Sequence, residues 1–422
     1  MSAIDEILDP IEIPRMVRVK QYFDRPVIEH IDDELARQLE QKNVLKKISK
    51  GMSIAITVGS RGIANQPAVV KKLVEILKEN GAEPFITPCM GSHGGASGAG
   101  QKEMLEGMGV TEEYTGAPIR SSMEVVQLGT TDVGLPVLID RNSWEADGII
   151  VLNRIKAHTS FEAPIESGLL KMIAIGLGKQ KGAESCHDLG FPSMYENILD
   201  ITRILIPQAN ILFGIGLIEN SFHETCRIEV LGKEEFEEKE PALLEEAKRL
   251  QAKLFFESLD ILIVDEVGKN ISGTGMDTNV IGRYHTGLGS GGPSITRIVV
   301  LDLTEESHGN ATGIGIADFT TRRLFDKMKF DQSYPNSLTS TVPVSANIPP
   351  VLKSDRQAIQ AAIRTCNKLD KKNIRIVRIK NTLSLEEIEV SEIMMDELRN
   401  DKRFTIEGNP YPFSFDDNGN LR

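Results

Sequence analysis

Three of the seven histidines lie in segments where an imidazole could do chemistry. His93 stands in "GSHGG", shortly after the apolar stretch "EPFITP", and His158 stands in "KAHTSF", shortly after "DGIIVLN". His187 lies further along the chain, in "ESCHDLG". Because an imidazole titrates near neutral pH, a pair of histidines facing one substrate can remove and return protons. The alternative for each histidine is a surface residue or a satisfied structural one.

Lys171 and the segment "GSRG" (59–62) offer two further kinds of chemistry. Lys171 lies between "SGLL" and "MIAIGLG", and loss of water in so apolar a segment makes a lysine a better nucleophile or covalent anchor. The alternative is a lysine at a helix edge with its ammonium group in water. "GSRG" precedes a predicted helix, where backbone N–H groups and Arg61 could hold a phosphate. An ordinary turn with a solvent-facing arginine is the alternative.

The elements around these residues predict an α/β protein. Residues 53–58 and 83–88 are short apolar runs typical of buried strands, and the apolar spacing of 65–81 predicts a helix between them. A strand–helix–strand unit favours a parallel sheet, and ligands bind at the carboxyl edge of such sheets. We expect further strands at 147–153, 261–267, 296–303 and 374–379.

Chain length and one long amphipathic helix, predicted at 241–259, suggest how the chain is divided. With 422 residues it exceeds one ordinary core. We therefore predict two α/β domains with mostly parallel sheets and the active site in the cleft between them. The first covers 1–258 and carries the cofactor and the catalytic histidines. The second covers 259–400 and completes the substrate site, and 401–422 form a C-terminal tail.

Composition excludes several classes of protein. The net charge of −13 without a basic cluster argues against a nucleic-acid-binding protein. The four cysteines form no CxxC pair, which argues against a disulfide framework or a structural zinc site and fits a reducing cytoplasm. The sequence has no apolar run long enough to cross a membrane and no recognisable signal peptide, so we expect a cytoplasmic protein.

Four fragments in this order resemble the lactate racemase family, whose members use a nickel-pincer nucleotide cofactor. "GSHGG" and "KAHTSF" resemble the loops of the family's two catalytic histidines, and "SGLLK" resembles its Ser-Gly…Lys motif. His187 is in register with the family's nickel ligand. The match spans about residues 53–190, with a weaker echo in "MDTNVIGR" (276–283).

The resemblance implies a role for each of these residues. Lys171 would anchor the cofactor covalently, His187 would bind nickel, and Ser60 and Arg61 would contact the cofactor phosphate. His93 and His158 would exchange protons with a 2-hydroxy acid while a hydride moves between its Cα and the cofactor. Cofactor-maturation proteins are implied as partners. Candidate substrate ligands in the second domain are Lys269, Asn279, Arg283 and His285.

Departures from the family pattern bear on the substrate. Lactate-specific members carry Arg-Pro after the first histidine, whereas Gly94 and Gly95 stand here. The interval from His158 to Lys171 is also longer. We therefore expect racemisation or epimerisation of a larger or more hydroxylated 2-hydroxy acid, such as a sugar acid.

Two other classes of function stay open at this level. One is an oxidoreductase with a dissociable nucleotide, which the strand–turn–helix unit favours weakly because "GSRGIA" lacks the GxGxxG spacing. The other is a non-catalytic ligand-binding homologue, since a fold does not fix a function. The oligomeric state is not predicted.

Overall fold

The computed structural model describes residues 2–60 and 62–422, and the chain forms two compact units. Unit 1 contains Met1–Phe23 and Ala252–Arg422, and unit 2 contains Asp24–Gln251. The predicted first domain, 1–258, is therefore wrong at both of its ends. The N-terminal segment belongs with the C-terminal half because its strand pairs there, and the chain leaves unit 2 at residue 251.

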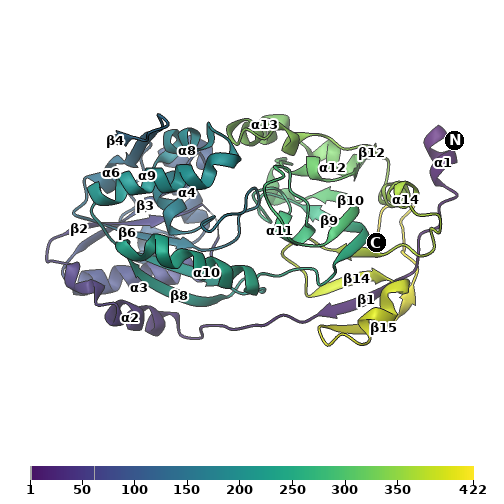
Figure 1. Cartoon of the computed structure of the whole chain (residues 1–422), viewed down its shortest axis with the longest axis horizontal. Helices are drawn as coiled ribbons and strands as arrows, with labels where there is room; N and C mark the ends of the chain where they lie inside the picture. The colour runs from purple at the N-terminus through teal and green to yellow at the C-terminus, as the bar shows by residue number, and fades with distance from the viewer. Residues whose placement is uncertain (1, 61) are drawn as a thin grey trace. The chain divides into compact units, whose positions relative to one another are not determined.

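Unit 2 contains a five-stranded sheet in the order β3-β2-β6-β7-β8. Figure 1 labels β2, β3, β6 and β8. The first four strands are parallel and β8 is antiparallel to β7. The strands of this sheet are β2 (Ser53–Val58), β3 (Glu83–Pro88), β6 (Gly148–Arg154), β7 (Ile211–Glu219) and β8 (Thr225–Gly232). A separate hairpin consists of β4 (Val125–Thr130) and β5 (Pro136–Asp140).

The helices of unit 2 lie on both faces of this sheet. One face packs on α2 and α3 through a continuous apolar core that includes Leu35, Leu73 and Ile56. On the other face, a Cβ at Gly214 of β7 would lie 2.8 Å from side chains of both Leu169 and Phe236, so α7 and α10 pack closely there. The helices are α2 (Ile31–Gln41), α3 (Gln66–Glu79), α4 (Gly98–Gly107), α5 (Glu112–Thr115), α6 (Arg141–Trp144), α7 (Leu169–Lys171), α8 (Lys179–His187), α9 (Met194–Gln208) and α10 (Phe236–Leu250).

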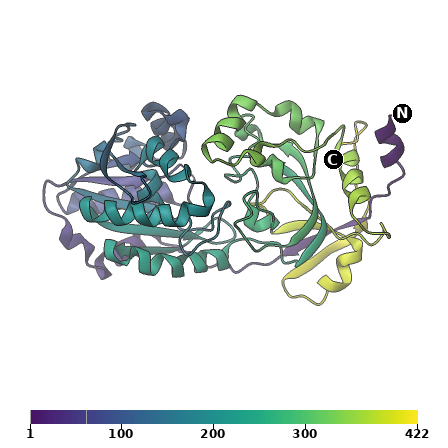
Figure 2. The same cartoon turned by 45° about the horizontal axis from the view of Figure 1, so that its top comes forward.

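Unit 1 contains an eight-stranded sheet in the order β12-β11-β10-β9-β13-β14-β1-β15. The strands from β12 to β13 are parallel, and the remaining pairs are antiparallel. The strands are β1 (Met16–Gln21), β9 (Ser258–Val267), β10 (Ser294–Leu303), β11 (Phe319–Thr321), β12 (Val351–Leu352), β13 (Ile376–Ile379), β14 (Glu387–Ser391) and β15 (Phe404–Tyr411). The helices are α1 (Ala3–Leu8), α11 (Thr278–Ile281), α12 (Arg322–Lys327), α13 (Phe330–Thr339), α14 (Asp355–Thr365) and α15 (Met395–Leu398). Figure 2 shows the strands of this sheet from a second angle.

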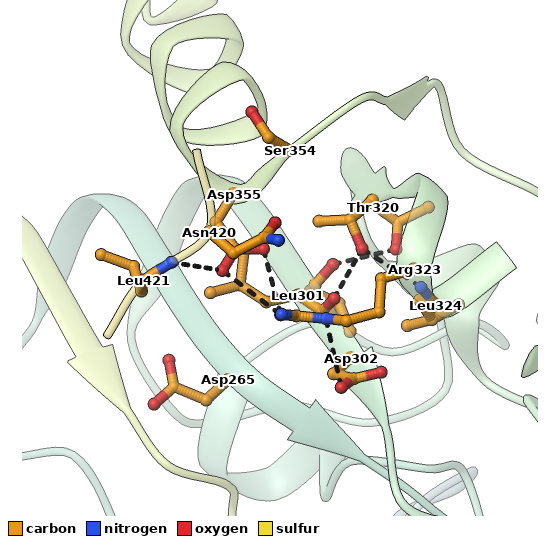
Figure 3. Close-up of polar contacts among 12 residues, drawn as sticks. Asp265, Leu301, Asp302, Thr320, Arg323, Leu324, Ser354, Asp355, Asn420 and Leu421 are labelled. Atoms are coloured by element: carbon orange, nitrogen blue, oxygen red, sulfur yellow. Dashed lines mark hydrogen bonds and ion pairs between the residues drawn. The ribbon is translucent and has the colours of Figure 1, made fainter. Parts of the chain in front are cut away.

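The C-terminal residues are integrated into unit 1 rather than forming the predicted tail. β15 pairs with β1. Further along, the Leu421 amide donates to Asp355 Oδ2 at 2.9 Å, as Figure 3 shows. Arg323 bridges this carboxylate and Asp302 at the end of β10 (Figure 3). The last residues are therefore tied to the carboxyl edge of the parallel strands.

The long helix predicted at 241–259 is α10, which begins at Phe236 and ends at Leu250. Gln251 has extended backbone angles, and Leu254 and Phe256 lie in the apolar core of unit 1. The apolar spacing therefore continues past the end of the helix because the chain passes from one core to another. Across residues 2–60 and 62–422, no helix combines the length and apolar character that crossing a membrane requires.

Candidate functional site

Three predicted site residues follow neighbouring parallel strands of unit 2. Ser60 follows β2, the His93 loop follows β3, and the His158 loop follows β6. β3 lies on one side of β2 and β6 lies on the other. The strand order therefore changes direction at β2, which is the topology at which α/β sheets bind ligands. The predicted placement at one carboxyl edge is confirmed by the strand order.

His93 contacts Ser60 directly. Its Nδ1 lies 2.5 Å from Ser60 Oγ, so the loops after β2 and β3 are joined by a short hydrogen bond. Gln101, which is fully buried in α4, donates from Nε2 to the carbonyls of Gly91 and His93 at 2.9 and 3.2 Å. One buried amide thus fixes the backbone on both sides of Ser92.

The glycines after His93 allow the loop to fold back on α4. Gly94 has a φ of +65°, and a Cβ on it would lie 2.7 Å from the backbone of Gly100 and Gln101. A Cβ on Gly100 would in turn lie 2.1 Å from the Gly94 carbonyl oxygen. Close backbone packing within the loop therefore accounts for both glycines without a ligand.

His158 lies in a loop that is organised by the buried carboxylate of Glu166. Glu166 Oε2 accepts from the His158 amide at 2.6 Å, and Oε1 accepts from the Ala163 amide at 3.2 Å. The Ser160 amide donates to His158 Nδ1 at 3.1 Å, so Nδ1 is an acceptor and a neutral ring carries its proton on Nε2. The ring packs on Phe161, with centroids 4.6 Å apart.

Lys171 is the last residue of the short helix α7, which continues through a π-helical turn (Met172–Gly176) towards α8. Glu240 from α10 caps this helix, because its Oε2 accepts from the amides of Leu169 and Leu170, both at 3.1 Å. Asn153, at the end of β6, donates to the Gly168 carbonyl at 2.8 Å. The position of Lys171 is therefore set by α10 and by the central strand.

His187, on α8, has the hydrogen bonding of a metal-ligating histidine. Nδ1 lies 2.7 Å from the Ala183 carbonyl and donates to it, which leaves the lone pair on Nε2 for a metal. Burial lowers the pKa of His187, and the nearby charge of Lys171 acts in the same direction. The ring is therefore neutral near pH 7, as metal binding requires.

Phe191 brings the second and third histidines together. Its ring centroid lies 5.9 Å from that of His158 and 5.6 Å from that of His187, which it meets edge-on. Cys186 is not a second donor at this point, since burial raises the pKa of its thiol to about 12 and keeps it protonated. Within the residues the structure describes, no group of three His, Cys, Asp or Glu side chains could hold a metal.

This donor set fits a metal that arrives with most of its own ligands. His187 offers one neutral nitrogen, and Lys171 is close enough to influence the pKa of His187. A bare divalent ion would need more protein ligands than one. A nickel that an organic cofactor already holds would need only this one, and Lys171 would be available to anchor that cofactor.

A fully buried ion pair joins the start of α8 to the ends of β5 and β3. Lys179 Nζ lies 3.4 Å from Asp140 Oδ1, and both side chains are completely inaccessible to solvent. Lys179 also donates to the Pro88 carbonyl at the end of β3. Asp140 Oδ2 accepts from Thr87 and from the amide and hydroxyl of Ser143. The start of α8 is thus joined to the strand that leads into the His93 loop.

The four candidate substrate ligands of unit 1 have different roles. Arg283 donates to Asp318 at 2.6 Å and to the carbonyls of Ile295, Thr296 and Ile316, so it fixes its loop, and its role as a substrate ligand stays a prediction. His285 and Lys269 are neighbours: burial lowers the pKa of His285 to about 4, and the charge of Lys269 contributes. The Asn279 side chain donates to Asp277 and accepts from Tyr284.

Several residues that build the site were not predicted from sequence: Gln101, Asp140, Glu166, Lys179, Phe191 and Glu240. Asp140, Lys179 and Glu240 act through contacts with distant segments. Gln101 and Glu166 contact loop backbone within ten residues, but no local pattern marks either of them. The one available signal was Phe191, an aromatic residue four positions after His187. Of the predicted residues, Arg61 lies outside the described part of the chain.

Comparison with known proteins agrees with this architecture. Residues 56–230 match the model of a domain of unknown function, DUF362. Among solved structures, the chain is similar to the lactate racemase apoprotein from Thermoanaerobacterium thermosaccharolyticum. The TM-score is 0.53 at 13% identity, and the alignment covers 88% of this chain and 99% of that one. No curated protein matches the sequence. The chain therefore has a lactate racemase-like α/β fold, and the predicted fold class is confirmed.

Proposed function

We propose that this protein is a racemase or epimerase of a 2-hydroxy acid that uses a nickel-pincer nucleotide. The observation that carries the proposal is the set of contacts at the carboxyl edge of the unit 2 sheet. His93 contacts Ser60, and Phe191 contacts the rings of both His158 and His187. Lys171 is close enough to influence the pKa of His187, and a Cβ on Gly91 of the His93 loop would lie 3.2 Å from Ala183 of the His187 helix. Similarity to a lactate racemase in fold supports the same conclusion.

The residues of unit 2 would hold the cofactor at three points. Lys171 would supply the amine for its covalent attachment, His187 Nε2 would bind its nickel, and Ser60, with Arg61, would contact its phosphate. When bound, the cofactor supplies a reversible acceptor for the hydride on the substrate Cα. Cytoplasmic maturation proteins that build it would be required partners.

His93 and His158 would perform the proton transfers. One of the two rings would accept the proton of the substrate hydroxyl, and the other would return a proton to that oxygen from the opposite side, so that either configuration at Cα could be restored. The Nδ1 atom of His158 accepts from the Ser160 amide, so a neutral His158 presents Nε2–H as a donor to the substrate oxygen. Uptake of a proton at Nε2 would require the other tautomer, in which Nδ1 gives up this hydrogen bond.

The substrate would be larger than lactate. The residues after His93 are glycines folded back on α4, so they place no cationic side chain where lactate-specific members carry arginine. We propose Lys269, Asn279 and His285 of unit 1 as ligands of the carboxylate or of additional hydroxyls. A sugar acid presents both kinds of group.

The test is to measure nickel per chain after the protein has been matured with the cofactor-making proteins. The His187→Ala variant is measured in parallel, and a known lactate racemase serves as the loading control. About one nickel in the wild type, lost in the variant, supports the cofactor assignment. A wild type without nickel beside a loaded control overturns it and leaves a dissociable nucleotide as the next candidate. Turnover of a panel of 2-hydroxy acids then tests the substrate, and turnover of lactate alone would refute the larger-acid assignment.

A further inference from the structure

The amphipathic helix α10 extends two ionisable side chains to the segments that carry His158 and Lys171. Lys248 Nζ lies 2.8 Å from Glu166 Oε1. Glu240, two turns earlier on the helix, caps the Lys171 helix through Oε2. The two side chains of one helix thus reach two consecutive segments of the chain, the His158 loop and the helix α7 that follows it.

The contact through Lys248 controls the shape of the His158 loop. Glu166 is 2% exposed and accepts from the amides of His158 and Ala163, so its carboxylate closes the loop on itself. A buried carboxylate requires a partner charge, and Lys248 supplies it. Without that cation the carboxylate would move towards water and release both amides.

The contact through Glu240 controls the helix that carries Lys171. Both donors to Glu240 belong to the first turn of α7, where amides have no partner within the helix. Gly168 is needed for this approach, because a Cβ there would lie 2.1 Å from Glu240 Oε1. The glycine of "SGLLK" therefore makes room for a carboxylate from a different helix.

We propose that Lys248 and Glu240 are positioning residues, and that α10 sets the spacing between His158 and Lys171. Neither side chain would touch the substrate. The roles of His158 and Lys171 in this statement rest on the proposed function. The connection of both segments to α10 rests on the hydrogen bonds and the ion pair alone. The two contacts have separable consequences, since one acts on a proton-transfer residue and the other on a cofactor anchor.

The first measurement is hydrogen–deuterium exchange of the apoprotein, which is independent of the proposed function. Lys248→Met should raise exchange about tenfold or more at 156–167, and Glu240→Met should do so at 168–178, with little change elsewhere in unit 2. Matched controls on the same helix are Glu245→Gln, which removes the exposed second partner of Lys248, and Glu238→Gln. If exchange rises evenly across unit 2, or not at all, the positioning role is wrong.

The second measurement separates turnover from cofactor retention in the loaded protein. Lys248→Met should lower kcat about tenfold to a hundredfold with nickel per chain unchanged, because a shift of about 1 Å at a catalytic group has this effect. Glu240→Met should lower the fraction of chains that retain cofactor mass after denaturation. A general structural role would change both kcat and cofactor retention in both variants, and that result would overturn the proposal.

If either methionine variant fails to fold, Lys248→Gln and Glu240→Leu take its place. Lys248→Arg and Glu240→Gln are expected to restore the wild-type values. A wild type without nickel would refute the proposed function and leave the exchange result standing.

Discussion

Replacing Lys179 by methionine should destabilise unit 2 by about 3–5 kcal/mol. The substitution keeps the length of the side chain but leaves Asp140 without its cation, and neither side chain has any contact with solvent. Removing one partner of a buried pair has a cost of this size because the remaining charge is uncompensated. The hydrogen bond to the Pro88 carbonyl is lost as well.

Differential scanning calorimetry can check this value. For a unit of this size, about 2–4 °C is lost per kcal/mol, so the unit 2 transition should fall by about 6–20 °C. Lys181→Met is the matched control, because Lys181 is exposed on the same helix, and its effect should stay within about 0.5 kcal/mol.

The double variant Lys179→Met with Asp140→Asn tests the cause. The asparagine carbonyl can still accept from Thr87 and Ser143, while the unpaired charge is gone. Much of the lost stability should return. If Lys179→Met is no worse than Lys181→Met, or if the double variant is less stable than Lys179→Met alone, the buried pair does not support the site as argued.

Two further predictions concern Glu240 and its neighbour. Gly168→Ala should destabilise unit 2 by about 1–3 kcal/mol in urea unfolding, because the new methyl group meets the carboxyl group of Glu240. The control is Gly107→Ala, which should be neutral or stabilising because a Cβ at Gly107 meets open space. Burial raises the pKa of Glu240 from 4.5 to about 7, so between these values the native state keeps a proton that the unfolded chain has lost. The free energy of unfolding should therefore fall as pH rises across this window, by about 3 kcal/mol at about 1.4 kcal/mol per pKa unit. Glu240→Gln should flatten that part of the pH profile, and an unchanged slope in this variant would contradict the assignment.

The local elements of both units were predictable because their signals are local. β2, α3 and β3 follow from two short apolar runs and a helical pattern with Pro67 in its first turn. The strands at β6, β9 and β10 were found within a few residues for the same reason. His93 and His158 could then be placed at one edge, since parallel strands share their carboxyl ends.

The supporting residues could not be found in this way. Glu240 lies in a run of acidic residues, and nothing in the run distinguishes the one carboxylate that is buried. Glu166 and Lys248 are distant in sequence, so their pairing depends on how α10 packs on the sheet. Ala252, Leu254 and Phe256 extend the apolar pattern of α10 but lie in the core of the other unit. For this reason the sequence misplaces both the end of the helix and the domain boundary.

The position of β1 constrains the order in which the protein can form. This strand lies between β14 and β15, so its partners are synthesised only when the ribosome reaches residues 387–411. At about 5–20 residues per second, β1 waits roughly 20–70 s for them. Residues 24–251, which carry both proposed catalytic histidines, are complete long before that. Unit 2 can therefore fold on the nascent chain while β1 is still unpaired. The sheet of unit 1 is completed only after β15 has been synthesised.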